Sequence, residues 1–371
     1  MLQKDTNVFV TGATGLIGGE LVRTLLTQPV GKVWALVRPT TDGHPELRLA
    51  QRLKRSASGE PHADAALSAV TGDVSAKRLG LSDADYDSVR READIIIHSA
   101  AETSFIRAAA CRRTNIAGAK HLIEFTRECT RNPLLVCLST AFVSGVVANE
   151  CLTEEDGRRP RSEHHNEYTH SKAVAEELVR SSGLPVLVVR PSVVLSAGVP
   201  DAAFARAILQ FVPLLNELDA VPINPAGRPD AVPVQFVVNS IIRLLQLPHL
   251  QYDCYHISAG DQGTATFGQL SPILDRFYGR PVPLRLIPLA QWTRDVHRNY
   301  IRTPEQRRIF ASLRNYLPFL NMNVLYDNSR LRAELGDRFP ECPPLTSYLE
   351  ELLSLISHDR GVTRWLRAKG A

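Results

Sequence analysis

Short runs of Val, Ile and Leu alternate with amphipathic stretches along the first 260 residues of the chain. Most of these runs are continuously apolar, which is typical of parallel strands covered by helices on both faces. The stretches between them, such as 18–27, 114–129 and 171–181, predict helices. This repetition predicts an α/β fold, a Rossmann-like doubly wound parallel sheet. The seven predicted strands are 7–10, 33–37, 69–70, 95–98, 134–138, 186–189 and 255–257.

The pattern changes in two other parts of the chain. Residues 196–230 contain a helix-like stretch, 204–218, which Pro213 interrupts, and then a loop rich in Pro and Gly. From about residue 265 the pattern is mostly helical, with many prolines. Because no Gly/Ser linker separates these parts, we expect them to pack closely. The predicted division is a Rossmann domain of residues 1–195 plus about 231–262, and a smaller, mostly helical substrate-binding lobe of about 196–230 plus 263–371.

The composition excludes several other classes of protein. A hydrophobic fraction of 44% and a charged fraction of 22% are ordinary for a globular protein, and a net charge of +4 does not indicate nucleic-acid binding. The six cysteines lack the spacing of zinc motifs, so we expect no metal site and no disulfide framework. The chain runs from its first residues into a predicted strand, and no stretch has the roughly 20 apolar residues of a membrane helix. We therefore expect a cytoplasmic protein without a signal peptide or transmembrane segment.

A glycine-rich turn, TGATGLIG, joins the first predicted strand to the first predicted helix. Its three glycines allow a tight turn, close approach to a pyrophosphate and close packing of helix on strand. The helix that follows offers free N–H groups and a positive dipole end to the phosphates. A glycine triplet also occurs in purely structural turns, but its place in this chain favours dinucleotide binding. The residues expected at the cofactor are Thr11, Gly12, Thr14, Gly15, Leu16, Ile17 and Gly18.

The residues after the second and third predicted strands bear on the choice of cofactor. Arg38 ends the second strand, where an acidic residue would bind the ribose of NAD and an arginine accommodates the 2′-phosphate of NADP. This favours NADPH over NADH, although a solvated arginine is the alternative. Asp73, with Val74 beside it, follows the third strand and is placed at the adenine. A turn-forming Asp after Gly72 is an equally good account.

Tyr168 and Lys172 lie four residues apart in a predicted helix that begins near Asn166. This spacing places both side chains on one face, one turn apart. A free tyrosine titrates near 10, and we expect the ammonium group to lower the pKa of the phenol so that the pair can pass a proton to a carbonyl oxygen. The lysine can also bind the nicotinamide ribose. The pair gains weight from its position, some 150 residues after the glycine turn.

A hydroxyl partner for this pair is expected where the strand 134–138 ends. The chain there reads Ser139-Thr140, at the edge of the sheet where ligands bind. Either hydroxyl there is able to hydrogen-bond a substrate carbonyl. Spacing alone does not choose between them, and a turn-capping role is the alternative for both.

These features together resemble the extended short-chain dehydrogenase/reductase superfamily over nearly the whole chain. Within it, the chain is similar to the fatty acyl-CoA reductase and thioester reductase group, the male-sterility-type NAD-binding proteins. The segments that carry the resemblance are VFVTGATGLIGGELVRTLL with VWALVR, IIIHSAAETSF, STAFV, NEYTHSKAVAEELV, LPVLVVRPSVVLSAG and YDNSRLRAELG.

The resemblance implies a catalytic triad of Thr140, Tyr168 and Lys172, with Ser139 as a possible supporting residue. It also implies that Asn115 supports the active-site backbone and a water, with a helix-surface or capping amide as the alternative. The further positions it assigns to the cofactor are His98, Ser99 and Ala100 along the dinucleotide, and Arg190 and Pro191 in the loop beside the nicotinamide.

The resemblance implies hydride transfer from NADPH to an acyl thioester on coenzyme A or an acyl carrier protein, giving an aldehyde and, after a second hydride, an alcohol. The group often has further C-terminal, carrier or adenylation domains, whereas about 100 residues follow the last predicted strand here, so we expect a monomer or homodimer that meets its acyl donor in trans. The loop 221–233 and the helical lobe would line the acyl pocket. Basic residues that could receive phosphates, unless they are only solvated faces, are Arg52, Lys54, Arg55, Arg158 and Arg159.

Two other functions fit the same residues. The fold and triad would also suit an epimerase or dehydratase of nucleotide sugars, or a dehydrogenase of a hydroxysteroid or other secondary alcohol. NAD that stays bound through purification would indicate the epimerase type, which Arg38 disfavours. A non-catalytic dinucleotide-binding regulatory protein would be expected to lose Tyr168 and Lys172, and this chain keeps both.

Overall fold

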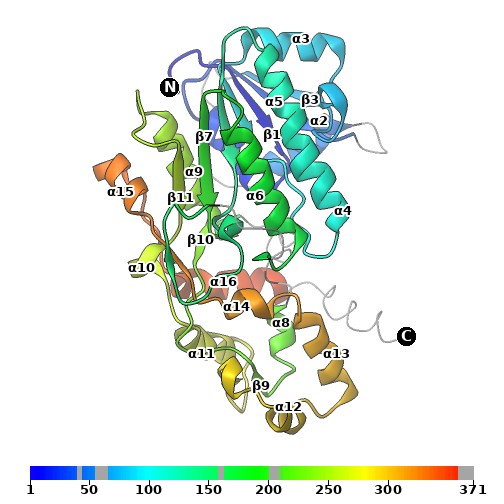
Figure 1. Cartoon of the computed structure of the whole chain (residues 1–371), viewed down its shortest axis with the longest axis vertical. Helices are drawn as coiled ribbons and strands as arrows, with labels where there is room; N and C mark the ends of the chain where they lie inside the picture. Colours follow the sequence, from blue (N-terminus) through cyan, green and yellow to red (C-terminus); the bar gives the residue numbers. More distant parts are fainter. Residues whose placement is uncertain (40–43, 55–65, 158–162, 200–208, 210, 358–371) are drawn as a thin grey trace.

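A parallel sheet of seven strands forms the centre of the molecule (Figure 1). The computed structural model describes residues 1–39, 44–54, 66–157, 163–199, 209 and 211–357. The strand order is β11-β7-β5-β4-β1-β2-β3, and every neighbouring pair is parallel. All seven predicted strands and the predicted fold class are confirmed. The strands are β1 (Val8–Thr11), β2 (Lys32–Val37), β3 (Ala66–Thr71), β4 (Ile95–His98), β5 (Leu134–Leu138), β7 (Val186–Pro191) and β11 (Cys254–Ile257).

Helices cover both faces of this sheet, and an apolar cluster fills each face. Alternate residues of a strand point to opposite faces, so Phe9 packs in one cluster while Val8 and Val10 pack in the other. One face is covered by α1 (Leu16–Leu26), α2 (Pro45–Lys54), α9 (Val234–Leu245) and α15 (Ser329–Leu335). The other is covered by α3 (Asp83–Glu92), α5 (Gly118–Glu128) and α6 (Glu167–Arg180).

Two of the predicted helices differ in how they begin. Helix α6 begins after Asn166, whose side chain accepts a 3.0 Å hydrogen bond from the backbone N–H of Thr169 and so caps the helix. The predicted helix 114–129 begins instead as α4 (Ala108–Cys111), continues as a π-helix, η2 (Arg112–Ala117), and only then becomes α5. Such widened turns occur frequently at functional sites.

A second, mostly helical layer lies below the sheet in Figure 1. Three short parallel pairs join segments that are distant in sequence: β8 (Val193–Leu195) with β10 (Ala231–Pro233), β9 (Ala220–Val221) with β12 (Arg285–Leu286), and β6 (Cys151–Leu152) with β13 (Leu325–Tyr326). Within the described residues, the remaining α-helices are α8 (Val212–Leu215), α10 (Gly260–Gly263), α11 (Phe267–Phe277), α12 (Arg294–Tyr300), α13 (Pro304–Leu313), α14 (Leu317–Leu320) and α16 (Leu345–Ser357).

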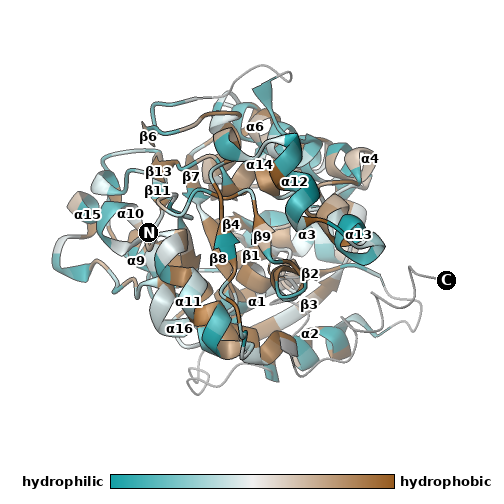
Figure 2. Ribbon diagram, turned by 90° about the horizontal axis from the view of Figure 1, so that it is seen from below, coloured by the Kyte–Doolittle hydropathy of each residue, from teal (hydrophilic) through white to brown (hydrophobic). Residues whose placement is uncertain are grey.

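The predicted helix 204–218 lies partly outside the described residues. Its described part contains α8, which accommodates Pro213 in its first turn, where a proline needs no N–H partner. Figure 2 shows the apolar strands in the interior, in brown, and the hydrophilic residues of α12 and α13 on the outside, in teal. Among the described residues, no helix has both the length and the apolar character required to cross a membrane.

Candidate active site

The glycine turn lies where the strand order reverses, between β1 and β4. Gly12 has a φ of +72°, and the N–H of Gly15 donates a 2.9 Å hydrogen bond to the carbonyl of Gly12. A Cβ at Gly12 would lie 2.6 Å from the backbone N of Ala100, and one at Gly18 would lie 2.2 Å from the carbonyl oxygen of Gly12. Both positions therefore require glycine, one for the fit against the end of β4 and one for the packing of α1.

The first turn of α1 is open to an anionic group. Gly15 is its N-cap and gives no side-chain hydrogen bond, and the first turn contains no acidic residue. The first N–H groups of a helix lack partners within it, and the helix dipole adds positive potential there. Thr14, Gly15, Leu16 and Ile17 are all partly exposed. These residues fit the pyrophosphate of a dinucleotide.

Thr11 and His98 join the carboxyl ends of β1 and β4. The Thr11 hydroxyl lies 2.8 Å from Nδ1 of His98 and accepts a 3.3 Å hydrogen bond from the N–H of Ala100. Burial, with a smaller contribution from the nearby Lys172, lowers the pKa of His98 to about 3, so the ring is neutral at physiological pH. Both side chains are buried, while the predicted cofactor residues Ser99 and Ala100 are partly exposed.

The residues at the ends of β2 and β3 differ in their surroundings. Arg38 is exposed directly after β2. Asp73 accepts hydrogen bonds from the backbone N–H of Ser75 at 2.8 Å and from its hydroxyl at 2.7 Å, so its carboxylate forms a local turn. The side chain of Val74 is buried, and its carbonyl oxygen lies 3.0 Å from Nδ1 of His121.

Arg52 does not have the surroundings expected of a solvated phosphate-binding residue. It is 5% exposed, and its Nη2 atom donates to Glu20 Oε1 at 2.9 Å and to the carbonyl of Leu16 at 3.0 Å. A Cβ at residue 19 would lie 2.6 Å from Nε of Arg52, so Gly19 allows this close approach. The side chain therefore clamps α2 to the first turn of α1. Lys54 is exposed, whereas residues 55, 158 and 159 lie outside the described part of the chain.

Tyr168, Lys172 and Thr140 come together at the end of β5. Tyr168 is hydrogen-bonded to Thr140, which is itself buried. The ammonium group of Lys172 donates a 2.5 Å hydrogen bond to the carbonyl of Leu138, the last residue of β5. Burial lowers the pKa of Lys172.

The pKa of Tyr168 differs from our expectation. Burial raises it to about 12, and the hydrogen bond with Thr140 opposes this rise only in part. The expected lowering of this pKa by Lys172 is not seen, because the burial of the phenol outweighs the groups that favour its ionised form. Tyr168 is therefore a neutral phenol at physiological pH, which is the form that donates a proton.

Sequence reasoning missed Glu176, which lies one turn beyond Lys172 on α6. The hydroxyl of Ser139 donates to Oε2 of Glu176 at 2.5 Å, and Nη2 of Arg190 lies 2.7 Å from Oε1. All three side chains are buried. Ser139 is thus committed to Glu176, which leaves Thr140 as the hydroxyl beside Tyr168. The i,i+4 spacing of Lys172 and Glu176 places both side chains on one face of α6, which was the only sign in the sequence of a role for Glu176. This spacing does not reveal that Ser139 and Arg190 are its partners.

Arg190 and Pro191 belong to β7, not to a loop. The guanidinium of Arg190 also donates from Nη1 to the carbonyls of Glu154 at 3.1 Å and Asp156 at 3.3 Å. Pro191 pairs with Ile257 of β11. In this structure the Arg190 side chain therefore binds protein groups, and its predicted place beside the nicotinamide stays a prediction.

Asn115 lies in the π-helix η2 and is 2% exposed, so it is not a surface amide. Its Oδ1 accepts from the N–H of Glu102 at 2.8 Å, and its Nδ2 donates to the carbonyl of Glu102 at 3.0 Å and to the hydroxyl of Ser171 at 2.9 Å. The amide thus ties the segment after β4 to helix α6. Its expected role in holding a water stays a prediction.

Aromatic rings join the lobe to the sheet beside Tyr168. The ring of Phe105 lies 6.1 Å from that of Tyr168, 5.7 Å from that of Tyr316 and 4.9 Å from that of Phe319, between centroids. Phe319 also contacts the ring of Phe142 at 5.5 Å. We call this set, with His165 at 4.9 Å from Phe319, the aromatic wall: Phe105, Phe142, His165, Tyr168, Tyr316 and Phe319.

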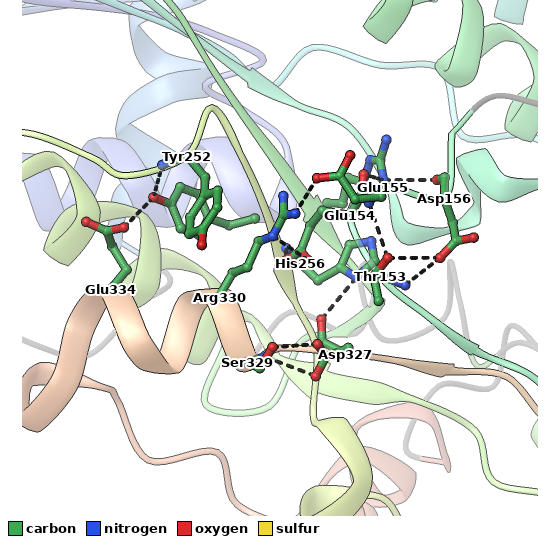
Figure 3. A network of polar contacts seen from close by, with 12 residues as sticks. Thr153, Glu154, Glu155, Asp156, Tyr252, His256, Asp327, Ser329, Arg330 and Glu334 are labelled. Carbon is green, nitrogen blue, oxygen red and sulfur yellow. Dashed lines mark hydrogen bonds and ion pairs between the residues drawn. The ribbon is translucent and has the colours of Figure 1, made fainter.

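A separate polar network ties β6, β11 and α15 together (Figure 3). The N–H of His256 donates to Glu154 at 2.8 Å, and Nε of Arg330 lies 3.5 Å from the same carboxylate. Nδ1 of His256 lies 3.1 Å from the carbonyl of Asp327. Burial, and then the charge of Arg190, lower the pKa of His256 to about 3. The network thus holds the segment after β6 and the start of α15 against the edge strand β11, and it contains Asp327 and Arg330 of the YDNSRLRAELG stretch.

The parallel sheet, the glycine turn at its reversal point and the Tyr168–Lys172 helix define a class of protein. The chain is an NAD(P)-dependent oxidoreductase of the extended short-chain dehydrogenase/reductase type, which binds a nicotinamide dinucleotide. It belongs to the male sterility protein family, whose model matches residues 10–241.

Relatives and solved structures agree with this assignment. A hybrid PKS-NRPS synthetase of Fusarium sp is 27% identical over 296 residues, which are 78% of this chain and 7% of that protein. The chain thus spans a small part of such relatives. The terminal R domain from the myxalamid PKS-NRPS pathway is similar with a TM-score of 0.79 and 23% identity, covering 98% of this chain and 92% of that one. A thiolation-reductase di-domain from an archaeal non-ribosomal peptide synthetase gives 0.71 and 18%, covering 98% and 76%.

Proposed function

We propose that this chain reduces the carbonyl group of an acyl thioester with NADPH, releasing a thiol and an aldehyde. A second reduction of the aldehyde would give the alcohol. The observation that carries the proposal is the neutral Tyr168 phenol, hydrogen-bonded to Thr140, beside the aromatic wall. The similarity to a terminal R domain and to a thiolation-reductase di-domain supports a thioester as the substrate.

The mechanism assigns each side chain a task. Thr140 and Tyr168 hydrogen-bond the carbonyl oxygen and stabilise the negative charge that develops on it. When bound, the cofactor supplies the hydride to the carbonyl carbon. The π electrons of the carbonyl move to oxygen, which takes the proton of Tyr168 and gives a hemithioacetal. Breakage of its C–S bond, with transfer of the hydroxyl proton to the departing sulfur, then gives the aldehyde and the free thiol.

Lys172 would position the cofactor and restore the proton of Tyr168. A bound dinucleotide would give its ammonium group the ribose hydroxyls as partners in addition to the Leu138 carbonyl. The positive charge one turn from Tyr168 would stabilise the phenolate formed when the proton is transferred. The aromatic wall would exclude water from the reacting carbon.

Arg38 supports NADPH as the cofactor. It is exposed at the end of β2, where it is free to meet a 2′-phosphate, and no acidic residue stands at that strand end. Replacing it with alanine is expected to lower kcat/KM with NADPH and leave kcat/KM with NADH nearly unchanged. The exposed Arg91 gives a matched control, since it lies at the end of α3. Equal losses with both cofactors would contradict this role.

The proposed domains divide these tasks between the two layers. Residues 1–195 plus about 231–262 would bind the cofactor, and about 196–230 plus 263–371 would bind the acyl group. Asn321 ties the end of α14 to the loop 221–233 through a 2.9 Å hydrogen bond to the carbonyl of Pro222, so that loop and the lobe are held together. We propose that they line the acyl pocket.

A substrate panel tests the proposal. Acyl-CoA, acyl-carrier, aldehyde and ketone series of increasing chain length are incubated with NADPH and the purified protein, and nicotinamide absorbance is followed. The expected result is oxidation of NADPH with acyl thioesters, with one NADPH consumed for each aldehyde formed and two for each alcohol. Turnover restricted to ketones, or NAD that remains bound through purification and is never consumed, would contradict it.

A further inference from the structure

The positive charge of the chain is concentrated in one short segment of the lobe. Residues 285–314 contain seven arginines and two acidic residues, a formal net charge of +5, whereas the whole chain carries +4. All other residues together therefore carry −1. The segment comprises β12, α12 and α13, and we call it the basic arm. Its arginines are Arg285, Arg294, Arg298, Arg302, Arg307, Arg308 and Arg314.

The arm presents this charge to solvent. All seven arginines are exposed, and α12 and α13 lie at the end of the molecule farthest from β1 in Figure 1. Within the described residues, Arg298 alone of the seven lies within 4.0 Å of a carboxylate, that of Asp295 at 3.8 Å. Their charge is therefore little compensated by the protein itself.

Apolar side chains are exposed beside these arginines. Val282 and Leu289, just before and at the start of the arm, are each 57% exposed. Protein interfaces are enriched in arginine and combine apolar contacts with a polar rim, so this mixture is typical of a surface that binds another protein. A nucleic-acid surface would need only the charge.

The basic arm is followed in the chain by residues of the aromatic wall. Helix α13 ends at Leu313, and Tyr316 and Phe319 of the aromatic wall follow at once. Both rings pack on Phe105, and Phe105 lies beside Tyr168. A macromolecule docked on α12 and α13 would thus be placed on the lobe side of the aromatic wall.

We propose that the basic arm docks an acidic protein that carries the acyl group as a thioester on a flexible prosthetic group. This rests on the proposed function, since it names the partner that would deliver the substrate to Tyr168. Complementary charge speeds encounter and fixes orientation, and its effect weakens as salt screens the charges.

The test compares one acyl group on three thiols: the phosphopantetheine of an acidic acyl carrier protein, coenzyme A, and N-acetylcysteamine, which has no charge. The variant Arg294→Glu/Arg307→Glu/Arg308→Glu reverses the arm. The control Lys77→Glu/Arg91→Glu/Lys120→Glu makes the same change in net charge with exposed residues elsewhere. We expect the arm variant to raise KM for the carrier-bound substrate at least tenfold at low salt, with kcat unchanged.

The remaining measurements test whether the effect is specific to the carrier protein and to the basic arm. The arm variant should leave KM for N-acetylcysteamine and coenzyme A thioesters unchanged, and the control should leave all three unchanged. A rise with coenzyme A alone would mean that the arm binds its phosphates, and a rise with the control would mean a general charge effect. Binding of duplex DNA as tight as that of the carrier at the same salt would show a polyanion surface. Any one of these last three results, namely a rise with coenzyme A alone, a rise with the control variant or equally tight DNA binding, overturns the proposal.

Failure of the proposed function is distinguishable from failure of the arm. If the wild-type protein turns over no thioester at all, the proposed function fails. Fluorescence anisotropy of the labelled acidic carrier then tests the arm by itself, because binding needs no turnover. Equal affinity of the wild type and the arm variant would overturn the docking proposal.

Discussion

The hydroxyl of Ser139 donates a 2.5 Å hydrogen bond to the carboxylate of Glu176. Ser139 directly precedes Thr140 at the end of β5, and Glu176 lies on the helix that carries Tyr168 and Lys172. One buried carboxylate therefore joins the two elements that supply the proposed triad. Because it also binds Arg190 of β7, it fixes the spacing of β5, β7 and α6 at their ligand-binding end.

Removing this carboxylate should be costly because it leaves a buried arginine without its charge partner. We expect Glu176→Met to reduce the free energy of unfolding by about 3–5 kcal/mol. The double variant Glu176→Met/Arg190→Met should lose less than the single variant, since no isolated charge stays buried. Denaturant unfolding of both variants measures this. A double variant that is less stable than the single one would contradict the argument.

Tyr168 should be essential for turnover but not for cofactor binding. Replacing it with phenylalanine removes the proton donor and keeps the ring beside Phe105. We expect kcat to fall about 10²–10⁴-fold with the Kd for NADPH unchanged. Tyr252→Phe is the control, because Tyr252 lies in the remote network of Figure 3. Full activity in Tyr168→Phe would contradict this role, because it would mean that turnover does not use the phenol.

Asp230 should make stability depend on pH. It is buried, and burial raises its pKa to about 6, against the opposing hydrogen bond from the N–H of Ala259 at 2.9 Å. An unfolded aspartate titrates near 3.9, so between about pH 4 and 6 the folded state keeps a proton that the unfolded state has lost. The contribution of Asp230 to stability is thus present below pH 4 and is lost as pH rises through 6.

The variant Asp230→Asn isolates this effect, because asparagine keeps an acceptor for Ala259 but does not titrate. Relative to the wild type, it should gain about 3 kcal/mol of unfolding free energy between about pH 4 and pH 7. Comparing the two proteins at each pH cancels titrations that they share. An unchanged difference across this range would mean that Asp230 has an ordinary pKa.

Gly12 should be indispensable for dinucleotide binding because of both its conformation and its surroundings. An alanine there would adopt a φ of +72° and place its Cβ 2.6 Å from the backbone of Ala100. Gly183→Ala is a matched control, since Gly183 has a φ of +75° and no atom within 4 Å of the added Cβ. We expect the control to lose about 1 kcal/mol of stability and to bind NADPH normally. Normal binding by Gly12→Ala would contradict the placement of the cofactor.

Most of the fold could be predicted from the sequence because its signals are local. Most strands of the main sheet are nearly continuous apolar runs, and Asn166 marks the start of α6 as a capping residue does. The paired strands of the lobe could not be predicted in this way. Leu325–Tyr326 pairs with Cys151–Leu152 across more than 170 positions, and two residues carry no periodic pattern.

The site shows the same division between local and distant effects. The Tyr168–Lys172 spacing is a local signal, and so is the glycine turn. The pKa of Tyr168 depends on its burial among other elements and on its hydrogen bond with Thr140. The surroundings of Arg52 depend on Glu20, whose carboxylate pairs with it from another helix. Charge and spacing in the sequence do not reveal whether a basic side chain meets solvent or a buried acid.

The central claim is that Tyr168 and Thr140 serve hydride transfer to a thioester carbonyl. NADPH with deuterium in place of the transferred hydride, mixed with an acyl-CoA, tests this by mass spectrometry of the product together with titration of the free thiol. The predicted result is one deuterium on the aldehyde carbon for each thiol released, with both lost in Tyr168→Phe. Thiol release without deuterium in the product, or equal labelling by Tyr168→Phe, would contradict it.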